Sequence, residues 1–153
     1  MHPKSFIRTL SLIHYSLCAG VLLFMLFAYW QIGSFNVGAA EGDIFVYIVP
    51  ILGMTGYFAS KYIYQNLIRN LPKEENLQTK LSRYRVASII QYALIEGPAF
   101  LALIAYFLNG AAMYLVIAAA LLLYLFAQRP SLDKLFREVP LNFEEKKQFD
   151  TLK

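Results

Sequence analysis

Charged residues are scarce in this sequence: Asp, Glu, Lys and Arg make up 16% of 153 residues, against about 25% in an average soluble domain. Hydrophobic residues make up 58% and aromatic residues 16%. A soluble domain of this length could not bury so much apolar surface, so the composition predicts a single-domain protein whose solvent is lipid.

Cysteine is also nearly absent. Cys18 is the only one, which excludes an intrachain disulfide and a multi-cysteine metal site. The sequence has no H-E-x-x-H, P-loop, G-x-S-x-G or C-x-x-C motif. Hydrolase, nucleotide-hydrolysing and redox activities therefore have no motif support. We expect no enzyme activity, no catalytic residue, no metal site and no cofactor.

The sequence has long apolar runs instead, with almost no charged residues in them. Helices in four of them would cross, or nearly cross, a hydrocarbon core about 30 Å thick. These runs cover residues 10–32, 44–60, 86–108 and 111–128. The sequence therefore predicts an all-α, polytopic membrane protein with four transmembrane helices.

The basic residues predict the orientation. All 14 Lys and Arg precede the first predicted span, lie between the second and third, or follow the fourth. The opposite side carries only Glu41 and Asp43. By the positive-inside rule both termini are cytoplasmic, in a multi-pass protein of the inner (plasma) membrane whose first partner is the lipid bilayer. This segregation leaves no arginine-rich stripe, so we expect no nucleic-acid partner despite the net charge of +4.

The cytoplasmic segments 61–85 and 129–153 have amphipathic patterns. Leu77, Leu81 and Tyr84 recur at helical spacing, so the third span is expected to extend into the cytoplasm as a helix.

Near the C-terminus, Asn142 and Glu145 have the spacing of a capping box that begins a last helix. Phe143 and Phe149 would then lie on the membrane surface. A solvated charged tail is the alternative.

The chain also resembles itself. A shift of 77 residues aligns residues 7–33 with 84–110 without a gap, at ten identities in 27 positions. Arg, Ser, Tyr and Gly contribute six of the ten, which shared hydrophobicity does not explain. We interpret the chain as a tandem duplication of a two-helix unit, about 7–81 and 84–149. Coincidence within a biased alphabet is the alternative.

Glu96 is the only formal charge inside a predicted span, about 11 residues from either end. An ionised carboxylate at that depth is costly unless it is paired or protonated or faces water. Tyr92 and Ser88 precede Glu96 by one and two turns on the same helix face, and Gln91 is nearby. These four residues predict a site for H⁺ or Na⁺. The alternative is a neutral Glu96 that hydrogen-bonds to a neighbouring helix.

Further residues belong to this prediction. Pro98 leaves the carbonyl of Leu94 without its helical donor, so this oxygen is a candidate partner for a proton or cation. Gly97 would allow close approach of another helix. We expect Pro50 to kink the second span. His14, in the first span, is a candidate proton relay to the carboxylate, although a helix-packing hydrogen bond is the alternative that we favour.

Residues 93–107 (ALIEGPAFLALIAYF) resemble the carboxylate-bearing helix of the c-subunit proteolipids of rotary ATPases. Residues 69–74 (RNLPKE) resemble the cytoplasmic loop of that family. The resemblance covers residues 69–107 and implies H⁺ or Na⁺ binding at Glu96 only. The second span lacks the family's dense glycine zipper, and the repeat makes the carboxylate helix first in its pair. The overall pattern also resembles small, uncharacterised four-span bacterial membrane proteins.

Two hypotheses of different classes follow. The chain is either a membrane subunit or carrier that binds a proton or cation at Glu96, or an accessory subunit in which protonated Glu96 only stabilises helix packing. Both predict a homo-oligomer or a larger membrane complex.

Overall fold

A computed structural model describes residues 3–38 and 40–150, and its described residues form six helices and no strand. Lys153, which was counted among the basic residues above, lies outside the described residues. The helices are α1 (Pro3–Ile32), α2 (Phe45–Arg69), α3 (Leu77–Asn109), α4 (Ala112–Ala127), α5 (Leu132–Glu138) and α6 (Phe143–Asp150). The all-α prediction is confirmed.

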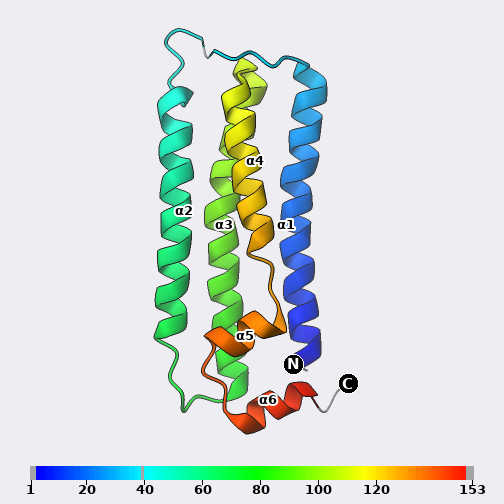
Figure 1. Ribbon diagram of the computed structural model, residues 1–153, viewed down its shortest axis with the longest axis vertical. Coiled ribbons are helices and arrows are strands. Elements are labelled where there is room, and N and C mark those ends of the chain that lie inside the picture. Colours follow the sequence, from blue (N-terminus) through cyan, green and yellow to red (C-terminus); the bar gives the residue numbers. More distant parts are fainter. Residues whose placement is uncertain (1–2, 39, 151–153) are drawn as a thin grey trace.

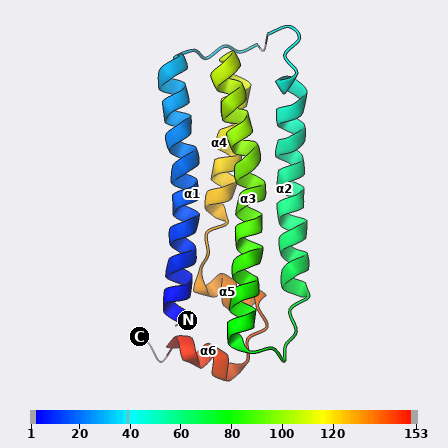
Figure 2. The same cartoon turned by 180° about the vertical axis from the view of Figure 1, so that it is seen from behind.

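Helices α1 to α4 stand side by side as a bundle, and α3 contacts each of the other three (Figure 1). The short helices α5 and α6 lie across one end of this bundle, where α1 also begins (Figure 2). The contact between α1 and α3 brings together two residues that were predicted to act with Glu96, His14 and Tyr92. The centres of their rings are 4.8 Å apart.

Two of the long helices end at glycines with left-handed backbone. Gly33 has a φ of +59° and Gly110 a φ of +67°. The N–H of Gly33 donates to the carbonyl of Tyr29 at 2.8 Å, and that of Gly110 to Tyr106 at 2.7 Å. A residue without a Cβ adopts this conformation at no steric cost, which is why the helices end there.

Helix α3 begins well before the predicted span. Asn76 is its N-cap, and the side-chain oxygen of Asn76 accepts from the N–H of Thr79 at 2.9 Å. The helical spacing of Leu77, Leu81 and Tyr84 predicted this extension of the helix, and in the structure Leu81 and Tyr84 are buried.

Two helices are long and apolar enough to cross a membrane, over Ser5–Ile32 and Leu77–Asn109. A third candidate exists if α4 and α5, which meet at a bend of 78°, count as one broken span. Helix α2 is long enough, but its tyrosines and Lys61 dilute its apolar residues. The described structure is therefore that of a helical membrane protein with two or three candidate spans.

The outer surface of the bundle fits this assignment. Large apolar side chains lie exposed on several helices, among them Trp30, at 80% exposure, and Leu123, at 72%. Such a surface is unfavourable in water and favourable in lipid.

Helix α2 packs closely on α3 at Gly56. A Cβ added to Gly56 would fall on the carbonyl oxygen of Leu94 and within 2.7 Å of the Pro98 ring. Both α2 and α3 continue as helices through their internal prolines, Pro50 and Pro98.

The last helix has the predicted capping box. The N–H of Asn142 donates to Glu145 Oε2 at 2.8 Å, and the N–H of Glu145 donates to Asn142 Oδ1 at 2.7 Å. Phe143 is 81% exposed, but Phe149 is only 4% exposed and packs edge-on against Phe136. The prediction that Phe149 lies on the membrane surface is therefore wrong, because α6 turns this side chain towards α5.

Candidate functional site

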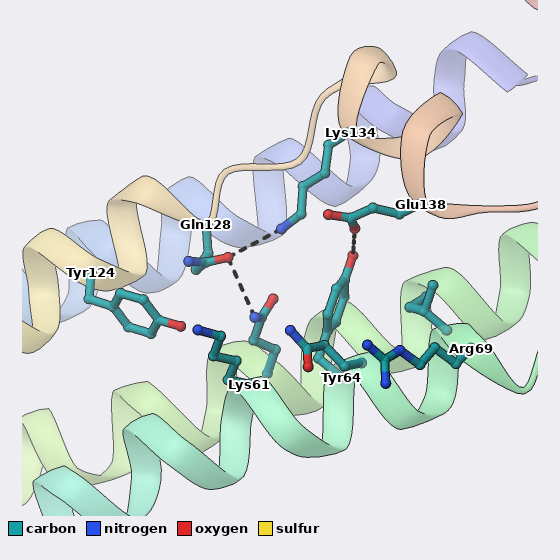
Figure 3. Close-up of a pocket in the computed structure, with 10 residues that line it drawn as sticks. Lys61, Tyr64, Arg69, Tyr124, Gln128, Lys134 and Glu138 are labelled. Atoms are coloured by element: carbon teal, nitrogen blue, oxygen red, sulfur yellow. Dashed lines mark hydrogen bonds between the residues drawn. The ribbon is translucent and has the colours of Figure 1, made fainter.

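A cavity of about 360 Å³ opens where α2, α3, α4 and α5 meet (Figure 3). Helix α2 contributes one face, with Lys61, Tyr64, Gln65, Ile68 and Arg69. The opposite side consists of Gln91 of α3, Tyr124 of α4, Gln128 just after α4, and Lys134 and Glu138 of α5. After the 78° bend between α4 and α5, the last two residues line the same cavity as the residues of α2.

A network of polar contacts surrounds Gln128 in this cavity. The side-chain oxygen of Gln128 accepts from Gln91 Nε2 at 3.4 Å and from Lys134 Nζ at 3.3 Å. The Lys134 ammonium also lies 4.9 Å from the centre of the Tyr64 ring, within the range of a cation–π contact. The hydroxyl of Tyr64 donates to Glu138 Oε2 at 2.5 Å.

The cavity is basic. It contains the cations Lys61, Arg69 and Lys134 but only one carboxylate, Glu138. Within the described residues none of these three cations forms an ion pair. A small anion with several acceptor oxygens would therefore find charge and hydrogen-bond donors on both sides of the cavity.

Burial shifts the pKa of two side chains in the cavity, Lys134 and Tyr64. It lowers the pKa of the Lys134 ammonium, and nearby Arg137 lowers it further, while Glu138 opposes this shift. Burial raises the pKa of the Tyr64 phenol, with contributions from Tyr84 and Glu138. Tyr64 therefore remains a hydrogen-bond donor at any physiological pH, and Lys134 is a cation that gains from a bound anion.

Of the residues predicted around Glu96, one reaches this cavity. Gln91 lines it, and the Tyr92 hydroxyl lies beside it, 3.4 Å from the backbone oxygen of Gln128. Ser88 is buried nearby on α3. Glu96 itself is half-buried and lies outside the cavity, and no hydrogen bond or ion pair of its carboxylate is found within residues 3–38 and 40–150.

The backbone around Glu96 is arranged differently from the prediction. The Leu94 carbonyl, expected to serve a proton or cation, faces Gly56 of α2 instead. Gly97 would meet nothing within 4 Å if it carried a Cβ, so no helix of the described chain approaches it. The close approach occurs at Gly56 because the Pro98 ring and the freed carbonyl together form the surface on which α2 packs.

His14 makes a packing contact. It is fully buried, and its Nε2 donates to the backbone oxygen of Leu125 on α4 at 2.8 Å. This is a helix-packing hydrogen bond of the kind that the sequence favoured for His14, and the proton relay to Glu96 stays a prediction. In the described part of the chain no group of three or more His, Cys, Asp or Glu side chains has the arrangement of a metal site.

Sequence reasoning used the basic residues of the cavity only to orient the chain. A local signal was present on α2, where Lys61, residues 64–65 and residues 68–69 recur every three to four positions and so share one helix face. Lys134 and Glu138 follow the same spacing on α5. Nothing local indicated that these two faces meet.

The long apolar helices, the apolar outer surface and the basic cavity define a helical membrane protein with a polar site at one end of its bundle. No protein-family model, curated protein or solved structure matches the chain. The resemblance of residues 69–107 to rotary ATPase proteolipids therefore stays a prediction.

Proposed function

We propose that this chain is a membrane binding protein, a carrier or an accessory subunit, that takes up an anionic group in the cavity between α2 and α5. The observation that carries the proposal is the set of three cations, Lys61, Arg69 and Lys134, that surround the cavity without an ion-pair partner among the described residues. Lys134 is half-buried, and a half-buried charge without a counter-charge is costly, so a bound anion would remove this cost. Lys61 and Arg69 are exposed, and they add positive charge and hydrogen-bond donors to the cavity lining.

The amides of the cavity support the same ligand class. Gln91 and Gln128 each carry an N–H₂ group, and the Gln128 oxygen already accepts from Lys134 and Gln91. The Glu138 carboxylate accepts from Tyr64 and so has a partner of its own. The donors that remain point to a phosphate-like or carboxylate ligand.

We further propose four transmembrane helices with both termini in the cytoplasm. Helix α2 has 25 residues, which span about 37 Å at ~1.5 Å per residue, and it runs alongside α3. The segregation of all Lys and Arg supports the orientation. The cavity then lies at the cytoplasmic surface of the inner membrane.

The tandem duplication is part of this proposal. Gly33 and Gly110 are equivalent in the two repeats, and each caps its helix through the same hydrogen bond to an equivalent tyrosine. Helices α1 and α3 would be the first helices of the two units, and α2 and α4 the second.

The test of anion binding uses the full chain purified in a neutral detergent, with glycerol 3-phosphate as the probe and calorimetry as the measurement. We expect Lys61→Met and Lys134→Met each to weaken binding about tenfold, since a charge-assisted hydrogen bond contributes about 1.5–3 kcal/mol. Lys73→Met is the matched control, because Lys73 is exposed and lies outside the cavity. Equal binding by all four proteins would contradict the proposal.

A second candidate function is the H⁺ or Na⁺ site at Glu96. It is favoured by the half-buried position of this carboxylate in the middle of α3, without a hydrogen bond in the described chain. Labelling by a hydrophobic carbodiimide, with protection by Na⁺ or high pH, is the expected result. A Glu96→Gln variant that behaves as wild type and a wild-type chain that stays unlabelled would leave only the accessory role, with Glu96 packing against a second chain.

A further inference from the structure

A second hollow of about 480 Å³ lies between α2 and α4. Its lining is almost entirely apolar and comes from positions between Pro50 and Phe58 on α2 and between Ile117 and Tyr124 on α4. Met54 and Phe58 are 63% and 61% exposed, so this groove opens on the outer surface of the bundle. In the four-span arrangement this surface faces the acyl chains of the bilayer.

The groove and the basic cavity meet at Tyr124, which lines both. The Tyr124 ring packs on Tyr57 of the groove at a centroid distance of 4.7 Å. Its hydroxyl points towards the cavity, beside Lys61 (Figure 3). One side chain with an apolar ring and a polar tip thus separates an apolar region from a basic one.

On both α2 and α4, the residues that line the apolar groove are followed along the helix by residues that line the basic cavity. On α2 the groove positions end at Phe58 and the cavity positions begin at Lys61. On α4 the groove positions end at Tyr124, where the cavity begins, and the cavity continues at Gln128. An amphiphile whose head lies in the cavity would therefore have its chain in the groove, without leaving the surface of the bundle.

We propose that the ligand is an anionic phospholipid of the bilayer, with its phosphate among Lys61, Arg69 and Lys134 and one acyl chain between α2 and α4. This inference rests on the proposed function, because it names the source of the bound anion. Charge complementarity selects the class of lipid: the cavity has three cations and one carboxylate, so a head with net negative charge fits better than a zwitterionic one.

The experiment titrates the full chain in a neutral detergent with dioleoyl phosphatidylglycerol or dioleoyl phosphatidylcholine and detects lipid adducts by native mass spectrometry. We expect the anionic lipid to bind at least tenfold more tightly than the zwitterionic one. Lys134→Met should remove most of this preference. Equal affinity for the two lipids would overturn the proposal.

A groove variant separates this inference from the proposed function. Ala120 is exposed and lines the groove, so Ala120→Trp fills the groove from its outer side, and Met54→Trp does so from α2. Each should weaken phosphatidylglycerol binding about tenfold and leave glycerol 3-phosphate binding unchanged. Leu123→Trp is the control, because Leu123 is exposed on the same helix and outside both hollows.

The other possible outcomes distinguish the lipid proposal from the anion-binding proposal. If glycerol 3-phosphate binds in a Lys134-dependent way but both groove variants bind the lipid normally, the lipid assignment fails and the anion site stands. If the lipid binds but Lys61→Met and Lys134→Met have no effect, both proposals fail. A dimer without lipid that Ala120→Trp dissociates would assign the groove to a second copy of the chain and overturn the lipid proposal.

Discussion

The ammonium nitrogen of Lys80 lies 2.9 and 3.1 Å from the two carboxylate oxygens of Glu145, and this ion pair is buried. Lys80 is 0% exposed and Glu145 is 7% exposed. The pair joins the first turn of α3 to α6, and the same carboxylate completes the capping box with Asn142. It holds the C-terminal helix beneath the bundle, next to the segment that carries Lys134 and Glu138.

Glu145→Gln is expected to detach α6 and to lower the stability of the chain by about 3 kcal/mol. Glutamine still fits a capping box, so the change isolates the loss of the counter-charge of buried Lys80. Thermal unfolding in detergent and the rate of proteolysis within α6 measure the effect. Glu144→Gln is the control, since Glu144 is exposed, and a similar result for both variants would contradict the role of the ion pair.

Gly56→Ala is expected to destabilise the chain by about 1–3 kcal/mol, because the added methyl group overlaps the Leu94 carbonyl and the Pro98 ring. Gly97→Ala is the matched control on α3. It meets nothing within 4 Å and should be neutral or stabilising by up to about 1 kcal/mol, since alanine is the better helix former. The unfolding temperatures of the two variants should therefore move in opposite directions or differ clearly in size.

Tyr64→Phe removes the hydroxyl that donates to Glu138 at 2.5 Å. The half-buried carboxylate then lacks its donor, and we expect a loss of about 1–2 kcal/mol of stability. Tyr62→Phe is the comparison, because Tyr62 is 72% exposed on the same helix. If both variants unfold at the wild-type temperature, the Tyr64–Glu138 hydrogen bond contributes nothing measurable.

The pH dependence of anion binding should depend on Lys134. Its pKa lies below the ordinary value of 10.5 because of burial, so as pH rises the ammonium loses its proton earlier than an exposed lysine does. The affinity for glycerol 3-phosphate should fall across that window because Lys134 loses its positive charge. The charge of the phosphate no longer changes there, so it does not contribute to the fall. Lys134→Met should bind weakly and lose this part of the pH profile. A wild-type profile in that variant would contradict the assignment.

Stability should change in the opposite sense over the same range. Between the lowered pKa of Lys134 in the folded chain and 10.5 in the unfolded chain, the unfolded state binds more protons. The free energy of unfolding therefore increases with pH in this window through this group. Thermal unfolding of wild type and Lys134→Met across the window measures the contribution.

The orientation can be tested with single cysteines in a Cys18→Ser background. A membrane-impermeant maleimide applied to intact cells should label Glu41→Cys. The same reagent should label Lys73→Cys only after the membrane is permeabilised, because Lys73 lies in the loop between α2 and α3. The reverse pattern would invert the proposed topology, and with it the membrane face on which the cavity lies.

Features that depend on neighbours within three or four residues could be predicted from the sequence. The left-handed turn at Gly110 and the capping box of Asn142 and Glu145 are of this kind. The continuation of α3 back to Leu77 also followed from local spacing. The prediction for Phe149 failed because the direction of α6 depends on the buried partner of Glu145, which is 65 residues away.

The cavity could not be predicted for the same reason. Lys61 and Lys134 lie on different helices, and their meeting depends on the rotation of α2 about its axis and on the 78° bend after α4. Apolar periodicity says which residues prefer lipid or core, but it does not say which neighbour each helix face meets. Glu96 could be singled out because it is a lone charge, yet its place outside the cavity is a property of the packing.

Composition indicated a membrane protein, because the apolar surface exceeds what a soluble domain of 153 residues can bury. The length of the apolar runs indicated helices. Only the tertiary structure decided where its polar groups gather. Contacts between helices arise from side-chain packing across long sequence separations, and the free Leu94 carbonyl is an example: the sequence left it without a donor, and the fold placed it against Gly56.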